Sequence, residues 1–169
     1  MTASASYYRI GVISDTHGFL NPAVFRIFEG VALILHAGDV GQDELLHELA
    51  VIAPVSAVSG NVDGAPDPRL RPLERQIETL AGRIAMTHGH LSSAPASDHV
   101  RLIHHFDKFH PQIVIHGHTH VAHLSTCEGV TVVNPGAAGR AGLGRPATVG
   151  IITVDIPGAP PRLEHVVLS

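Results

Sequence analysis

Charged residues, cysteine and long hydrophobic runs are all scarce in this sequence, and each shortage excludes a class of protein. Charged residues make up 15% of the chain and hydrophobic residues 44%, a balance that argues against disorder. The single cysteine, Cys127, cannot form an internal disulfide. No apolar run approaches the roughly 18 residues that a membrane span needs, so we expect no association with a membrane.

Basic residues are few as well. Lysine and arginine total 11 against 15 acidic residues, the formal net charge is −4, and the basic residues form no cluster. Proteins that hold duplex nucleic acid carry a basic patch, so we expect no stable complex with nucleic acid. A small phosphorylated substrate remains compatible with this charge, because bound metals can supply positive charge. The abundant residue is histidine, with 14 copies.

The chain has the length of one domain. At 169 residues it can bury a sizeable core, and it contains no linker, internal repeat or low-complexity tract. The amino-terminal stretch MTASASYYRI has no basic region followed by an apolar one, as an export signal would. We therefore expect one domain over residues 1–169 and a cytoplasmic location.

Strands alternate with helices in the first sixty residues. The apolar runs YYRIGVIS, VALILHAGD and APVSAVSG are separated by NPAVFRIFEG, with Asn21 as N-cap, and by QDELLHELA, which predicts a parallel β-α-β-α-β unit. ERQIETL and RIAMTH around Ala81-Gly82 predict a hairpin. SDHVRLIHHFDKF predicts a helix capped by Ser97. The remaining runs, QIVIHG, VAHLSTC, VTVVN, ATVGIITVD and RLEHVVL, are short strands.

Residues that can bind metals follow the ends of these strands. The carboxyl ends of parallel strands meet at one edge of a sheet, where ligands bind in open α/β folds. Residues i and i+2 of an extended segment point the same way, so Asp15 with His17, and His118 with His120, can each face one cluster. Buried acids and imidazoles gathered there would be costly without a cation. Five loops supply the seven candidate metal ligands, which are Asp15, His17, Asp39, Asn61, His88, His118 and His120.

The motifs DTH, GD, GN, HGH and GHTH, in that order, resemble those of the calcineurin-like metallophosphoesterase superfamily. The resemblance runs from Asp15 through NPGA at 134–137 and is closest to the small bacterial phosphodiesterase branch, which has a eukaryotic relative serving as a retromer subunit. It implies an α/β fold of two packed β-sheets flanked by helices, in four layers αββα. It also implies two metals, one held by Asp15, His17 and His120, the other by Asn61, His88 and His118, with Asp39 as the bridge.

The donor set agrees with that division. A carboxylate has two oxygens and can span two cations, whereas an amide oxygen or an imidazole serves one. Oxygen and imidazole donors without thiolate suit Mn²⁺ first, with Ni²⁺, Zn²⁺ or Fe²⁺ as alternatives. Two such cations can orient a shared water as hydroxide for attack on phosphorus. We therefore expect a phosphodiesterase that uses a metal-bridging hydroxide on a small phosphodiester or nucleotide-like substrate, and that self-associates as relatives often do.

Val62 departs from the family pattern. Many members place a histidine after the GN asparagine, thought to protonate the leaving group, and the small bacterial branch often places cysteine there. A hydrocarbon cannot donate a proton, and a positioned general acid is worth about 10²–10⁴-fold. We expect a preference for good leaving groups such as phenolates, unless His90 or water substitutes. The expected catalytic residues are therefore Asp39, Asn61 and His90.

Other polar residues have predicted roles outside the set of metal ligands. Arg140 and Arg145 are either phosphate clamps or solvated loop cations. Asp63 is expected to cap a loop, and His36 and His116, inside apolar strands, to be neutral structural residues. The histidines assigned to the surface or to a helix face are His99, His104, His105, His110 and His165.

Two further classes of function remain open. One is a protein-interaction scaffold on the same fold, which the retromer relative exemplifies and Val62 keeps in view. The other is a metal-buffering protein, suggested by the 14 histidines. Single ligands placed in order at strand ends do not resemble the dense histidine tract expected for metal storage.

Overall fold

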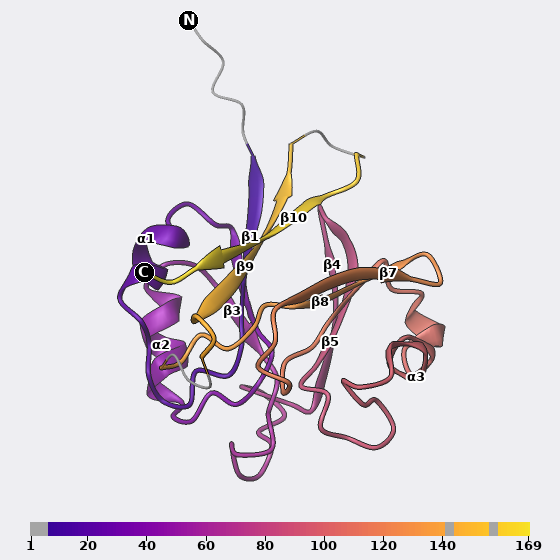
Figure 1. The fold of residues 1–169 in the computed structure, drawn as a ribbon, viewed down its shortest axis with the longest axis horizontal. Coiled ribbons are helices and arrows are strands. Elements are labelled where there is room, and N and C mark those ends of the chain that lie inside the picture. Colours follow the sequence, from indigo (N-terminus) through magenta and orange to yellow (C-terminus); the bar gives the residue numbers. More distant parts are fainter. Residues whose placement is uncertain (1–6, 141–143, 156–158) are drawn as a thin grey trace, which may run out of the picture.

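The structure is a computed structural model that describes residues 7–140, 144–155 and 159–169. Two five-stranded sheets pack face to face, with helices on the outer face of each (Figure 1). This arrangement confirms the expected fold class. None of the helices in the described ranges is long and apolar enough to cross a membrane.

The first sheet has the strand order β10-β9-β1-β2-β3. The three parallel strands predicted from the first sixty residues lie at its centre and one edge, because β1 pairs with β2 and β2 with β3 in parallel. The antiparallel strands β9 and β10 complete it on the other side. The bounds are β1 Tyr8–Ile13, β2 Leu33–His36, β3 Val55–Ala57, β9 Thr148–Val154 and β10 Arg162–Val167.

The second sheet has the order β4-β5-β6-β8-β7. The predicted hairpin around Ala81-Gly82 is confirmed as the antiparallel pair β4 and β5, and β5, β6 and β8 run parallel. The carboxyl ends of β5 and β6 therefore meet at one edge. The bounds are β4 Glu74–Thr79, β5 Gly82–Thr87, β6 Ile113–Ile115, β7 His123–Cys127 and β8 Val130–Asn134.

Three short helices cover the outer faces of the sheets. α1 (Ala23–Ile27) and α2 (Glu44–Ala50) lie beside the first sheet, and α3 (His99–His104) lies at the opposite end of the molecule beside the second (Figure 1). A 3₁₀ turn at Asp107–Phe109 follows α3. The Asn21 side chain accepts from the Ala23 N–H as expected of a cap. The prediction for α3 was wrong by one residue, because Asp98 and not Ser97 accepts from the Arg101 N–H.

Hydrophobic side chains fill three layers between these elements. Ile10 and Val12 of β1 pack against Ile84 and Met86 of β5 in the layer between the sheets. Ile13, on the opposite face of β1, packs under α1 and α2 in the outer layer. Burial on both faces is what the continuous apolar runs of the central strands require. The packing of the two sheets brings their strand ends to a common edge.

Candidate metal centre

Backbone hydrogen bonds join the loops that leave β1 and β2. The N–H of Asp15 donates to Gly38 O at 3.0 Å, and the N–H of His17 donates to Asp39 O at 3.0 Å. A further bond from the His118 N–H to Asp15 Oδ2, at 3.2 Å, connects the loop after β6 to the first sheet. Residues from both sheets are therefore fixed around one point.

Five of the seven predicted ligands have left-handed backbone. Their φ angles are 55° at Asp15, 48° at His17, 53° at Asp39, 70° at His118 and 58° at His120. Such conformations cost on the order of 1–2 kcal/mol per residue and persist only where the surroundings enforce them. The premise that Asp15–His17 and His118–His120 are extended segments was therefore wrong, although each pair does reach the cluster. Strain of this kind is frequent at functional sites, which makes this edge of the sheets the candidate site.

Two glycines allow the loops to approach closely. A Cβ at Gly60 would overlap the Asp39 carboxylate and backbone, and one at Gly117 would overlap the Ser14 side chain and lie 2.8 Å from Asp15 Oδ2. Neither overlap can be relieved by moving the contacted side chain, because Ser14 and Asp39 are both buried. Glycine is thus required at both positions.

The first donor group gathers around Asp15. His120 Nε2 lies 3.2 Å from Asp15 Oδ1 and 3.3 Å from His17 Nε2, and His17 Nε2 lies 3.8 Å from Asp39 Oδ2. One donor atom from each of these four residues lies within 4.8 Å of the others. Two ligands on bonds of about 2.0–2.1 Å at a tetrahedral angle are roughly 3.3 Å apart. The spacing therefore fits a shared cation.

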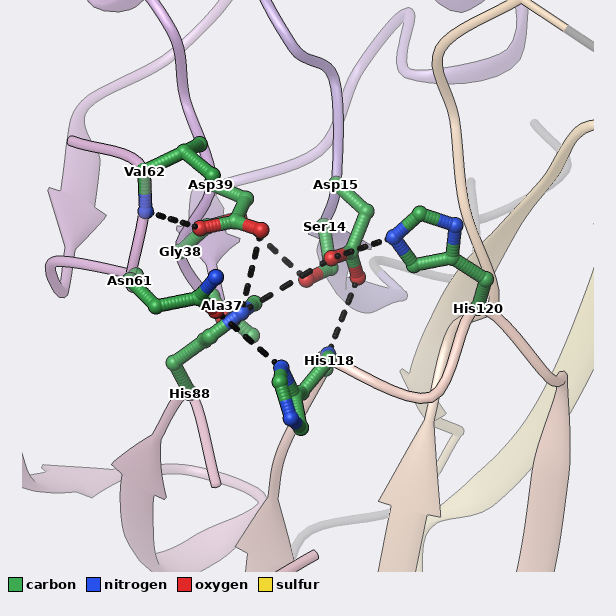
Figure 2. Close-up of polar contacts among 12 residues, drawn as sticks. Ser14, Asp15, Ala37, Gly38, Asp39, Asn61, Val62, His88, His118 and His120 are labelled. Carbon is green, nitrogen blue, oxygen red and sulfur yellow. Dashed lines mark hydrogen bonds and ion pairs between the residues drawn. The ribbon is translucent and has the colours of Figure 1, made fainter. Parts of the chain in front are cut away.

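The second donor group lies on the other side of Asp39. His88 Nε2 is 3.3 Å from Asp39 Oδ2 and 3.8 Å from Asp15 Oδ1, and His118 Nδ1 is 3.1 Å from Asn61 Oδ1. Figure 2 shows Asp39 and Asn61 on one side of the cluster and His120 on the other, with Asp15, His88 and His118 between them. All seven predicted ligands are thus brought together.

One oxygen of Asp39 faces both groups. Oδ2 is the atom near His17 and near His88. Oδ1 instead accepts from the Val62 N–H at 3.1 Å (Figure 2). Asp39 was expected to span two cations because a carboxylate has two oxygens, but in the structure the same oxygen, Oδ2, faces both donor groups.

Unpaired buried atoms in the cluster fit a cation. The Nδ1–H of His88 donates to Ala37 O at 2.7 Å, which leaves the lone pair on Nε2. That Nε2 and Asp15 Oδ1 are both buried without a hydrogen-bond partner in the described part of the chain. Buried polar groups are rarely left unpaired, and an imidazole held by its other nitrogen is the usual arrangement of a metal ligand. The residues present therefore fit a divalent metal.

The charges of the cluster also fit a bound cation. Burial raises the pKa of Asp15. Burial alone would also raise the pKa of Asp39, but His88 and the Val62 N–H lower it to about 2. The two carboxylates outweigh burial at His88 and raise its pKa. A divalent cation would place positive charge beside these two buried carboxylates.

The remaining candidates lie at different distances from the cluster. The His90 ring is 5.4 Å from that of His88 and 6.4 Å from that of His118. Burial and those two imidazoles lower the pKa of His90, so it is neutral and can donate one hydrogen bond. The Val62 side chain is 52% exposed, so a hydrocarbon faces solvent beside Asn61.

The two predicted phosphate clamps, Arg140 and Arg145, lie in different surroundings. Arg140 stacks over the Phe19 ring at 5.1 Å and lines a recess of about 180 Å³ together with His17 and His120. Arg145 is exposed and does not line that recess. Only Arg140 is therefore placed to meet a group bound at the cluster.

Several structural expectations agree with what is observed. Asp63 accepts from the N–H groups of Gly41 and Gly60, so it caps the loops. Burial lowers the pKa of His36 and of His116 to about 4, so both are neutral. His104 and His105 pair with glutamates at the surface, and His110 is exposed.

Two residues that the sequence patterns did not single out contribute to these loops. The Asn134 amide donates to Gly117 O and to Thr119 Oγ1, so it holds the GHTH loop. Its place in an NPG turn was the available signal. His123 was also overlooked, and His99, assigned to a surface or helix face, is half-buried against it.

The sequence matches the family described as "Calcineurin-like phosphoesterase superfamily domain" over residues 8–156. A probable metallophosphoesterase from Methanothermobacter thermautotrophicus is 38% identical over 136 residues, covering 76% of each chain. Among solved structures, Vacuolar Protein Sorting 29 from Cryptosporidium parvum has a TM-score of 0.76 at 20% identity and covers 95% of this chain and 97% of its own. A structure described as a novel archaeal phosphodiesterase has a TM-score of 0.73 at 26% identity and covers 95% and 99%.

Proposed function

Since the chain belongs to the calcineurin-like phosphoesterase superfamily, we propose that it is a two-metal phosphodiesterase. The substrate is a small phosphodiester or a nucleotide-like molecule. The observation that carries the proposal is the position of Asp39 Oδ2, which lies between one donor group at His17 and another at His88. The likeness to the archaeal phosphodiesterase supports the choice of a diester.

The chain's own residues divide the work around the cations. Two divalent metals, when bound, supply Lewis acidity and lower the pKa of water for attack on phosphorus. Asp15, His17 and His120 would hold one of them, Asn61, His88 and His118 would hold the other, and Asp39 would contact both. The chemistry of this donor set favours Mn²⁺, with Ni²⁺, Zn²⁺ or Fe²⁺ as alternatives.

The surroundings of the cluster set the choice of substrate. The Arg140 guanidinium is held over Phe19 beside His17 and His120, where it can donate to a phosphate oxygen. Val62 offers no proton to a leaving group, and the neutral His90 offers a hydrogen bond and no positive charge. Diesters whose leaving group is stable as an anion, such as aryl diesters, therefore suit this site.

Reconstitution with single metals tests the proposal. Tag-free protein is stripped with a chelator and given Mn²⁺, Ni²⁺, Zn²⁺, Fe²⁺ or Mg²⁺ in turn. We then measure hydrolysis of bis(4-nitrophenyl) phosphate beside the number of metals bound. We expect turnover with at least one of the first four metals. We also expect a fall on the order of 10³-fold in Asp39→Asn, because the shared oxygen loses its charge.

Asp43→Asn is the matched control. Asp43 pairs with Arg71 at 2.6 Å, away from the cluster, so the same change of acid to amide should leave turnover intact. Wild-type activity in Asp39→Asn would show that the site is wrongly assigned.

A scaffold is the second candidate, favoured by the TM-score of 0.76 with Vacuolar Protein Sorting 29 and by the absence of a proton donor in the side chain of Val62. Two metals bound per chain with no turnover of any diester would favour the scaffold over the enzyme.

A further inference from the structure

Three histidines that the metal centre does not use surround a separate recess. His99 begins α3, His116 follows β6, and His123 begins β7. The recess has a volume of about 260 Å³, and Ala96, Thr119 and Val121 complete its lining. The His99 ring lies between the other two, 5.5 Å from that of His116 and 4.9 Å from that of His123.

His116 presents an unpaired nitrogen. The side chain is 2% exposed, and its Nδ1–H donates to Gly117 O at 3.0 Å, so the lone pair is on Nε2. That Nε2 is buried and has no hydrogen-bond partner among residues 7–140, 144–155 and 159–169. His88, a ligand of the metal centre, shows the same two features, an Nδ1–H bonded to a backbone carbonyl and a free Nε2. A neutral imidazole fixed in this way is prepared to bind a metal.

The spacing of the rings matches that of the metal centre. The centroids of His17 and His120, assigned to one cation, are 5.2 Å apart, and those of His88 and His118, assigned to the other, are also 5.2 Å apart. Two imidazoles on metal–nitrogen bonds of about 2.0–2.1 Å have centroids roughly 5 Å apart at a tetrahedral angle. The His99 centroid lies 5.5 Å from that of His116 and 4.9 Å from that of His123, just above and just below the value of about 5 Å.

His99 and His123 can supply the other two ligands. The His123 Nε2 bonds to Ser125 Oγ at 2.8 Å, which orients the ring and leaves Nδ1 for a ligand. Burial and the neighbouring His123 lower the pKa of His99, so its lone pair is available. Among the residues that the structure describes, no carboxylate lines the recess. A donor set made only of imidazoles suits Zn²⁺, Ni²⁺ or Cu²⁺ and not Mg²⁺ or Ca²⁺.

We propose that His99, His116 and His123 form a third metal site, which binds one transition-metal ion such as Zn²⁺ with water as the remaining ligand. His99 separates the other two rings, so closing the site around one ion requires rotation of the half-buried His99 and His123 side chains. A bound ion joins α3 to β6 and β7, next to the loop that carries His118 and His120. The proposal does not depend on the phosphodiesterase activity.

Zinc binding to tag-free protein tests this site. The variants are His99→Gln/His123→Gln and, as a control with the same number of histidines removed, His47→Gln/His104→Gln. His47 and His104 are exposed and lie outside the recess. After incubation with Zn²⁺ and removal of loosely bound metal, zinc per chain is measured by mass spectrometry. We expect the first variant to lose one equivalent and the control to lose none.

A second background separates this site from the metal centre. Asp15→Asn/Asp39→Asn removes both buried carboxylates of the centre and should retain one equivalent of Zn²⁺. Adding His99→Gln and His123→Gln to that background should abolish it. Equal zinc content with and without His99 and His123 would overturn the proposal, and so would an equal loss in the control variant, which would mark adventitious binding to surface histidines. Failure of hydrolysis alone would leave these outcomes unchanged.

Discussion

The two sheets contribute different chemistry to the candidate metal centre. The loops of the first sheet supply all the oxygen donors, Asp15, Asp39 and Asn61, and one imidazole. The loops of the second sheet supply only imidazoles, from His88, His118 and His120. Both carboxylates are buried, with Asp15 0% and Asp39 3% exposed; of the second-sheet imidazoles His88 is buried beside them, whereas His118 and His120 are exposed.

This difference shows how the site is assembled. The first sheet contains two buried carboxylates that repel each other, and the second sheet places imidazoles next to them. Neither half is a complete site, because the contacts between Asp15 and His120 and between Asp39 and His88 cross from one sheet to the other. A cation bound there would hold the two sheets together and neutralise the charge of the first.

The sharpest way to test the comparison is to remove charge from the first sheet. Asp15→Asn should lower kcat/KM on the order of 10³-fold. In chelator the same variant should be more stable than wild type by about 1–2 kcal/mol, because a buried carboxyl with an unpaired oxygen is no longer present. Turnover and thermal unfolding with and without metal measure the two effects.

His120→Asn is the matched change on the second sheet. It should also lose activity, but His120 is exposed, so stability in chelator should change by less than about 0.5 kcal/mol. If both variants gained or both lost stability, the two sheets would not differ as described.

Low pH should lower the stability of the metal-free protein through His36, which lies in the first sheet. Burial lowers the pKa of this imidazole to about 4, whereas the unfolded chain titrates near 6.5. The unfolded state therefore binds more protons below pH 6.5, and stability falls as the pH drops from 6.5 towards 4, by about 3 kcal/mol for this residue. Urea unfolding in chelator across that range should show a shallower slope for His36→Asn, and an unchanged slope would contradict the assignment.

A proton donor at position 62 should extend the range of substrates. Val62 follows the ligand Asn61 on the first-sheet side, and its side chain is exposed, so Val62→His can be accommodated. We expect hydrolysis of alkyl diesters to rise about tenfold, with less change for aryl diesters, because only a poor leaving group needs a proton. Val62→Phe, which adds size and no proton donor, is the control, and equal gains for both substrates would refute the explanation.

The smallest expected effect concerns the two arginines. Arg140→Ala should raise KM about tenfold with kcat little changed, because it removes a charged donor from the recess beside His17. Arg145→Ala should change KM by about twofold or less, because Arg145 does not line the recess. Equal effects of the two substitutions on KM would show that both act as clamps.

Much of the fold followed from local patterns. Apolar runs that end in glycine and polar residues predicted the strands of both sheets, and Ala81-Gly82 predicted the hairpin. The cap of α3 was misplaced because Ser97 and Asp98 are both good capping residues, and only the backbone direction at Asp98 decides which side chain reaches the Arg101 N–H. Arg140 and Arg145 also looked equivalent in the sequence, because no local pattern shows which of them stacks on Phe19.

The sequence by itself determined which residues could form the site and which strands along the chain carry them, because strand ends are marked by neighbouring residues. Only the tertiary structure decided that Asp39 Oδ2 faces both donor groups, that five of the predicted ligands adopt left-handed backbone, and that His99, His116 and His123 share a recess. Each of these depends on contacts between segments far apart in the chain, which form only when the two sheets pack.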